Sequence, residues 1–187
     1  MSKLVDATRL NVQALAEAGA VLNESLLLYK LERLAPESVD LKAENTINWR
    51  AKFELRENAG GQASGHSDVW VHIEATASIA LTCQRCLTAV LTPLAVAQWY
   101  RFVASEAIAM AEDDASDEDL LVMAPQFDLL AVLEDELLMD LPLVPMHDVC
   151  PVSSALSALS AGRVEHAEPD AEKPHPFAAL AQLKKPN

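Results

Sequence analysis

The stretch VWVHIEATASIALT, residues 69–82, alternates apolar and polar side chains along its length. Apolar residues fill the odd-numbered positions from Val69 to Leu81, and the even-numbered positions include His72, Glu74 and Thr76. A period of two residues is typical of a strand with one face in the core and one in solvent. We therefore predict a half-buried strand here.

Two neighbouring segments show a similar pattern. Over residues 45–56, the residues from Ile47 to Leu55 alternate between an apolar face and a charged face. Residues 90–103 also read as extended, with Pro93 indicating an edge position or a bulge. Because no helix separates the three segments, they favour an antiparallel meander, with Gln84 and Arg85 at a reversal.

Helical patterns lie at both ends of these strands. Residues 6–18 and the leucine-rich residues 23–34 are each predicted to form a helix. The clearest helix is FDLLAVLEDELLMD, residues 127–140, which Asp128 can cap. Residues 106–119 carry seven carboxylates and are predicted to form a solvated, mobile loop.

Together these elements predict an α+β fold. It comprises an antiparallel sheet that could be barrel-like, N-terminal helices and one packed acidic helix. We expect a single domain over residues 1–150. Residues 151–187, rich in Ser, Ala, Pro and charge, are expected to be a flexible linker ending in a C-terminal docking segment.

The net charge of −14 is concentrated in residues 102–150, which hold 13 acidic and no basic residues. This distribution excludes a uniformly basic nucleic-acid-binding face. The aromatic content of 5% also argues against a surface built on stacked bases. A local basic strip remains as a candidate RNA contact. Its members are Arg50, Lys52, Arg56, Arg85 and Arg101.

The sequence shows no signal peptide at its start and no apolar run long enough for a membrane span, so we expect a cytoplasmic protein without a membrane partner. Its five glycines form no phosphate-binding loop. The adjacent Glu134 and Asp135 point in different directions on a helix, which does not favour a shared acid–base site. We therefore expect no catalysis and no small-molecule substrate.

The chain has three cysteines, and two of them stand two residues apart in LTCQRCL, residues 81–87. A redox CxxC pair opens a helix, whereas Cys83 and Cys86 lie between two predicted strands, which favours metal ligation. His147 and Cys150 would complete a Cys3His zinc site. The alternative is that the cysteines are ordinary buried side chains, since no rule of sequence makes the two pairs neighbours.

The motifs LTCQRCL, FDLLAVLEDELLMDLPLVPMHDVC and EKPHPFAALAQLKK, in this order, resemble the bacterial YceD-like family, whose members are called large ribosomal RNA subunit accumulation protein. The resemblance covers about the last two thirds of the chain. It implies a non-enzymatic factor for the synthesis, processing or stability of large-subunit (23S) ribosomal RNA. The alternative is a zinc-stapled protein-interaction module without a ribosomal role.

Two routes to such a function are open. The basic strip could contact precursor RNA, or the acidic segment of residues 106–140 could bind a basic ribosomal protein or assembly factor. We favour the second, because carboxylates repel RNA and attract cationic protein surfaces. The candidate partner-binding residues lie on the acidic helix and near the C-terminus. They are Glu134, Asp135, Glu136, Phe177, Leu180 and Leu183.

Overall fold

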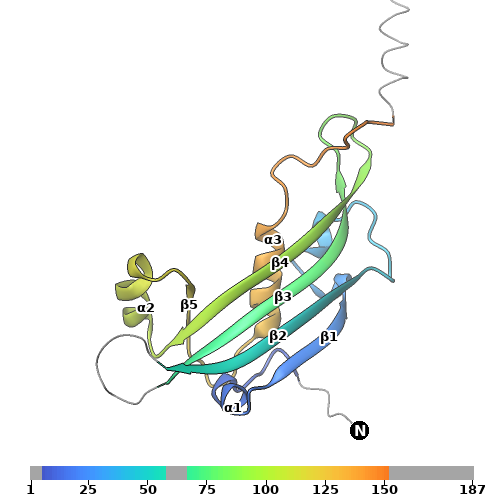
Figure 1. Ribbon diagram of the computed structural model, residues 1–187. Coiled ribbons are helices and arrows are strands. Elements are labelled where there is room, and N and C mark those ends of the chain that lie inside the picture. The colour runs from blue at the N-terminus through green and yellow to red at the C-terminus, as the bar shows by residue number, and fades with distance from the viewer. Residues whose placement is uncertain (1–5, 58–66, 152–187) are drawn as a thin grey trace, which may run out of the picture. The chain divides into compact units, whose positions relative to one another are not determined.

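The structure is a computed structural model (Figure 1), and it describes residues 6–57 and 67–151. Its centre is a five-stranded sheet in which the strands lie side by side in sequence order. The strands are β1 (Val21–Leu27), β2 (Thr46–Glu57), β3 (Ser67–Thr82), β4 (Ala89–Val103) and β5 (Asp119–Val122). The helices are α1 (Val12–Glu17), α2 (Glu106–Glu112) and α3 (Leu129–Met139), with 3-10 turns η1 (Leu28–Lys30), η2 (Ala35–Glu37) and η3 (Asp113–Ala115).

The sheet confirms the predicted α+β class. Strands β1 to β4 form antiparallel pairs, whereas β5 pairs with β4 in parallel. Within the described residues the sheet ends at β1 on one side and at β5 on the other, so it is open and not closed into a barrel.

One face of the sheet forms the core with α3, which crosses behind β3 and β4 in Figure 1. The alternation predicted from the sequence is present, since Phe53, Val71 and Ile73 are fully buried on this inner face. Leu133 and Leu137 of α3 are equally buried against them. The opposite, outer face of the sheet therefore carries the even-numbered polar side chains of β2 and β3.

Helix α3 begins where the sequence predicts, because the Asp128 carboxylate accepts a hydrogen bond from the Ala131 amide at 3.0 Å. Its Glu134 is only 7% exposed. That carboxylate accepts hydrogen bonds from the backbone amides of Arg33 (2.7 Å) and Leu34 (3.0 Å), and from Arg33 Nε (3.1 Å). One buried side chain thus fastens the segment after β1 onto α3.

The prediction of a helix over residues 23–34 is wrong. Residues 23–27 belong to strand β1, and residues 28–30 form η1. Strand β1 pairs with β2 from Val21 opposite Lys52 to Leu27 opposite Thr46. Leucine favours helices, but such a preference is weak and tertiary pairing overrides it. Here β1 supplies hydrogen-bond partners along the edge of β2, which would otherwise lack them.

The prediction of a loop over residues 106–119 is also wrong, because α2, η3 and the first residue of β5 occupy all of this segment except residues 116–118. Ser105 caps α2. Arg101 of β4 holds the rest in place, since its guanidinium donates hydrogen bonds to Glu118 (2.7 Å), Glu112 (2.8 Å) and Ser116 (3.0 Å). One cation therefore offsets part of the repulsion expected from the sequence.

Among residues 6–57 and 67–151, most of β4 has no second neighbouring strand, because β5 pairs with it only from Tyr100 to Val103. Pro93 lies in the remaining part, as the sequence indicated for an edge. Side chains bind some of the backbone groups on the edge of β4 that faces away from β3. Asp140 accepts a hydrogen bond from the Ala95 amide at 2.8 Å, and the His147 ring contacts the Ala89 carbonyl.

Among the described residues, no helix is long and apolar enough to cross a membrane. The predicted linker and C-terminal segment, with Phe177, Leu180 and Leu183, lie outside the described residues. The domain boundaries expected from the sequence therefore stay a prediction.

Candidate metal centre

The first half of the candidate centre is a tight turn between β3 and β4. The Leu87 amide donates to the Cys83 carbonyl at 2.8 Å, and the Cys83 amide donates to the Thr88 carbonyl at 2.9 Å. Leu87 has a φ of +59°, in the left-handed region that a non-glycine residue seldom adopts. This turn confirms the predicted reversal at Gln84 and Arg85.

The second half is the loop that follows α3, and backbone contacts dock it on the turn. The Gln84 amide donates to the Pro145 carbonyl at 2.9 Å, and Arg85 donates to the His147 carbonyl at 2.8 Å. Arg85, which the sequence assigned to the basic strip, therefore belongs to the scaffold of this centre. The contacts bring two segments about sixty residues apart in sequence into one site.

The imidazole of His147 is oriented as metal-binding histidines usually are. Its Nε2 lies 3.0 Å from the Ala89 carbonyl oxygen, which can only accept, so Nε2 carries the proton. Its Nδ1 lone pair then faces the Cys86 Sγ at 3.5 Å. A backbone carbonyl that fixes the tautomer in this way is the common second contact of a ligating histidine.

The four candidate ligands gather closely, as predicted. One ligand atom each from Cys83, Cys86, His147 and Cys150 lies within 4.8 Å of the others. In a tetrahedral zinc site with Zn–S of about 2.3 Å and Zn–N of about 2.05 Å, sulfur and nitrogen ligands are about 3.6 Å apart. The observed 3.5 Å between Cys86 Sγ and His147 Nδ1 fits that geometry. The donor set could thus hold a metal such as zinc.

Cys83 is fully buried, yet its surroundings favour the anion. Burial raises the pKa of its thiol, but hydrogen bonds from the backbone amides of His147, Cys86 and Arg85 have the larger, opposite effect, and the pKa falls to about 5. The Cys83 sulfur in turn raises the pKa of His147. Amides directed at a sulfur stabilise the thiolate, which is the form that binds metals.

The remaining basic-strip residues are divided between two places. Arg50, Lys52 and Arg56 lie together on the outer face of the sheet, where carboxylates of the same face pair with them. The ion pairs are Arg50–Glu74 (3.7 Å), Lys52–Glu54 (2.5 Å) and Arg56–Glu54 (2.6 Å). Arg101 is set apart, since its guanidinium binds the acidic segment.

The proposed partner-binding residues of α3 differ from one another in accessibility. Glu134 is buried and bound to the backbone of residues 33 and 34. Asp135 is exposed and forms an ion pair with Arg33, and Glu136 is half-buried. Only Asp135 of the three therefore presents its side chain openly to a partner.

The structure also shows a cluster that the sequence analysis missed. Arg56, Trp70, His72 and Trp99, here called the aromatic platform, meet on the outer face of the sheet. The Arg56 guanidinium lies 4.3 Å from the ring centre of Trp70 and 3.9 Å from that of Trp99, and His72 stacks on Trp99 at 4.4 Å. In the sequence, only the position of Trp70 among the polar residues of the alternating stretch pointed to this cluster. Which residues contact Trp70 depends on the register of the strands, which the sequence does not show.

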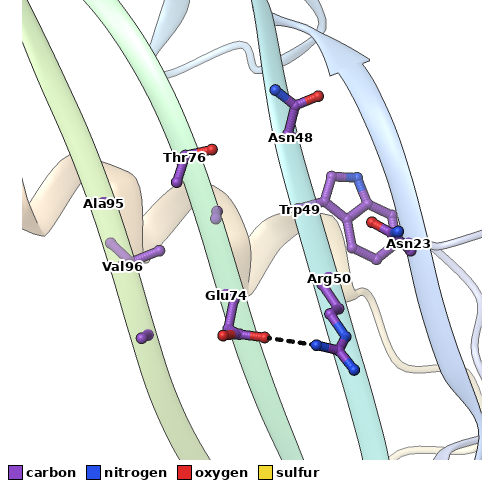
Figure 2. A pocket seen from close by; sticks show the side chains of 10 residues that line it. Asn23, Asn48, Trp49, Arg50, Glu74, Thr76, Ala95 and Val96 are labelled. Carbon is purple, nitrogen blue, oxygen red and sulfur yellow. Dashed lines mark ion pairs between the residues drawn. The ribbon is translucent and has the colours of Figure 1, made fainter.

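Beside the platform the outer face has a shallow hollow of about 410 Å³ (Figure 2). Ala95 and Ala97 of β4 leave space there because their side chains are small. Polar and charged side chains from the neighbouring strands surround that space. They include Asn23, Asn48, Arg50, Glu74 and Thr76, and Figure 2 shows the ion pair between Arg50 and Glu74.

Comparisons with known proteins bear on both halves of the metal centre. A family model described as large ribosomal RNA subunit accumulation protein YceD matches residues 71–184. The protein of that name from Haemophilus influenzae is 44% identical over 61 residues, which is 32% of this chain and 33% of the relative. The match therefore spans about a third of the relative's length. No solved structure shows a significant match.

Proposed function

The chain belongs to the family of the large ribosomal RNA subunit accumulation protein YceD, and on that premise we propose that it supports the synthesis, processing or stability of 23S ribosomal RNA. The family match to residues 71–184 is the observation that carries this proposal. The family is named for the accumulation of an RNA and not for a reaction. We therefore propose a binding factor, which would act in the cytoplasm where bacterial ribosomes are assembled.

We propose that a basic ribosomal protein or assembly factor is one partner. Residues 102–150 carry 13 carboxylates and no basic side chain, a charge that would speed encounter with a cationic surface. Within this segment, α2 and η3 present exposed carboxylates at Glu106, Asp113 and Asp114. Replacing these three with glutamine or asparagine should weaken retention of basic proteins from cell extract, and unchanged retention would contradict this route.

We further propose that the Cys3His cluster holds one structural zinc ion. Four protein ligands would close the coordination shell, which is the pattern of structural and not of catalytic zinc. The ion would fasten the loop after α3 to the turn between β3 and β4. Purified protein should contain one zinc per chain, and Cys83→Ser should reduce that content. Clearly substoichiometric zinc in the wild-type protein would contradict the assignment.

Depletion of the protein from cells tests the ribosomal function directly. We expect less mature 23S RNA and an accumulation of large-subunit precursors, with 16S RNA little changed. We also expect the protein to sediment with those precursors in a gradient of cell extract. A zinc-stapled interaction module without a ribosomal role, the competing function, would leave the ratio of the two RNAs unchanged.

A further inference from the structure

The aromatic platform is placed where the core does not require it. Trp70 and Trp99 project from the outer face, whereas Trp49 is 3% exposed and belongs to the core. Both outer indoles are half-buried, and the side chain of His72 is 21% exposed. A row of flat rings and a guanidinium on the solvent side of a sheet offers stacking surfaces.

The platform and the hollow form one continuous strip. His72 pairs with Trp99 across β3 and β4, the next outward pair is Glu74 with Ala97, and the one after it is Thr76 with Ala95. Successive outward residues of a strand are about 6.6 Å apart. The stacking surface is therefore followed directly by the open, polar-lined hollow.

The polar lining of the hollow has unused hydrogen-bonding capacity. Over residues 6–57 and 67–151, the side chains of Asn23, Asn48 and Thr76 form no hydrogen bond with other side chains or backbone groups. An asparagine amide presents both donors and an acceptor, as the edge of a nucleobase does. The charged pair of Arg50 and Glu74 completes a lining able to contact a planar polar ligand.

Resting on the proposed function, we infer that this outer face binds single-stranded RNA. Unpaired bases would stack against the platform, and one base would enter the hollow and contact Asn48 and Arg50. Proteins that bind single-stranded RNA combine exposed planar side chains with cations that contact the phosphates. A duplex does not fit this use, because its bases are already stacked on one another.

The charges of the strip predict how such binding depends on salt. Arg50, Lys52 and Arg56 are the cations available to phosphates, and each is already paired with Glu54 or Glu74. Three phosphate contacts with a single strand would give a slope of log K against log salt concentration of about −2, at roughly −0.7 per contact. Stacking therefore supplies most of the affinity, in keeping with a chain whose net charge is −14.

The test uses the full chain, purified in buffer that contains zinc, and fluorescent oligouridine and oligoadenosine strands of about ten nucleotides. Binding is measured by anisotropy at several salt concentrations, and by quenching of tryptophan emission from Trp70 and Trp99. We expect Trp99→Leu and Arg56→Gln each to weaken binding about tenfold, since stacking is worth about 1–3 kcal/mol per base. The matched controls are Tyr29→Leu and Lys30→Gln, which change exposed side chains elsewhere and should leave binding unchanged.

Circular dichroism and thermal melting establish that each variant is folded before binding is compared. The inference is overturned if no strand binds at low salt, if duplex RNA binds as well as single strands, or if both platform variants bind like the wild type. The same variants expressed in depleted cells separate the two proposals. Normal 23S RNA with either variant overturns the RNA platform and leaves the proposed function standing, whereas normal 23S RNA after depletion overturns the function itself.

Discussion

The buried carboxylate of Glu134 gives a quantitative test of how the N-terminal part of the chain is held on α3. Replacing it with alanine removes the acceptor of two backbone amides and of Arg33 Nε. Hydrogen bonds to charged groups contribute about 1.5–3 kcal/mol, and a buried amide left without a partner costs about 1–3 kcal/mol. Leu34, one of the donors, is fully buried, so water cannot readily replace the carboxylate.

We therefore expect Glu134→Ala to lower the free energy of unfolding by about 3–5 kcal/mol, which for a chain of this length lowers Tm by about 10 °C. Glu134→Gln keeps an amide oxygen for the two backbone donors and should cost only about 1–2 kcal/mol. Asp135→Ala, which removes an exposed carboxylate that pairs with the same Arg33, serves as the control and should cost less than about 1 kcal/mol.

Urea denaturation followed by circular dichroism measures all three variants. If Glu134→Ala unfolds within about 1 kcal/mol of the wild type at an unchanged denaturant dependence, the carboxylate does not fasten the segment as described. In that event the exposed control and the buried variant would be indistinguishable.

Three further predictions concern the sheet and the acidic segment. Leu133→Ala should destabilise the protein by about 2–5 kcal/mol in the same denaturation assay, because this fully buried side chain would leave a cavity between α3 and the sheet. Arg101→Gln removes the guanidinium contacts to Glu112 and Glu118. It should therefore speed hydrogen exchange of the amides in α2 without a comparable change in α3, and an equal change in the exchange rates of both helices would contradict this. Lys52, by its hydrogen bond, lowers the pKa of Glu54 despite partial burial, so the stability that Glu54 contributes is present above its unfolded pKa of about 4.3 and is lost as the pH falls through the lower folded value. Glu54→Gln should therefore flatten the dependence of Tm on pH below about pH 4.3, and an unchanged profile would show that the pairing has no such effect.

The sequence predicted those parts of the fold that depend on local pattern. The alternation around Val71 and the Asp128 cap each correspond to an observed element, because period and capping act over a few neighbouring residues. Residues 23–34 were misassigned because the edge of β2, which their backbone completes, is remote in sequence. The same limit hid the acidic segment's order, which depends on Arg101 reaching across from β4.

The candidate metal centre and the aromatic platform also differ in how far a local sequence pattern predicts them. Cysteine and histidine separated by two residues are typical of metal sites, so each half was recognisable in the sequence. The only further assumption was that the two halves lie close together in the fold, as they do. The platform has no such spacing, since Trp70 and Trp99 meet only through the register of β3 with β4, and Arg56 reaches them from β2. A low aromatic content therefore did not exclude a concentrated aromatic surface.

The exposed flank of β4 has a consequence for how the protein behaves when crowded with its own copies. An edge strand with unpaired backbone amides and carbonyls can pair with a strand of another molecule, and repeated pairing of this kind leads to fibres. Here Pro93 has no amide hydrogen, and the Ala95 amide already donates a hydrogen bond to the Asp140 carboxylate. Within the part of the chain that the structure describes, an approaching strand would therefore meet no continuous row of free backbone donors around Pro93, which disfavours edge-to-edge addition there.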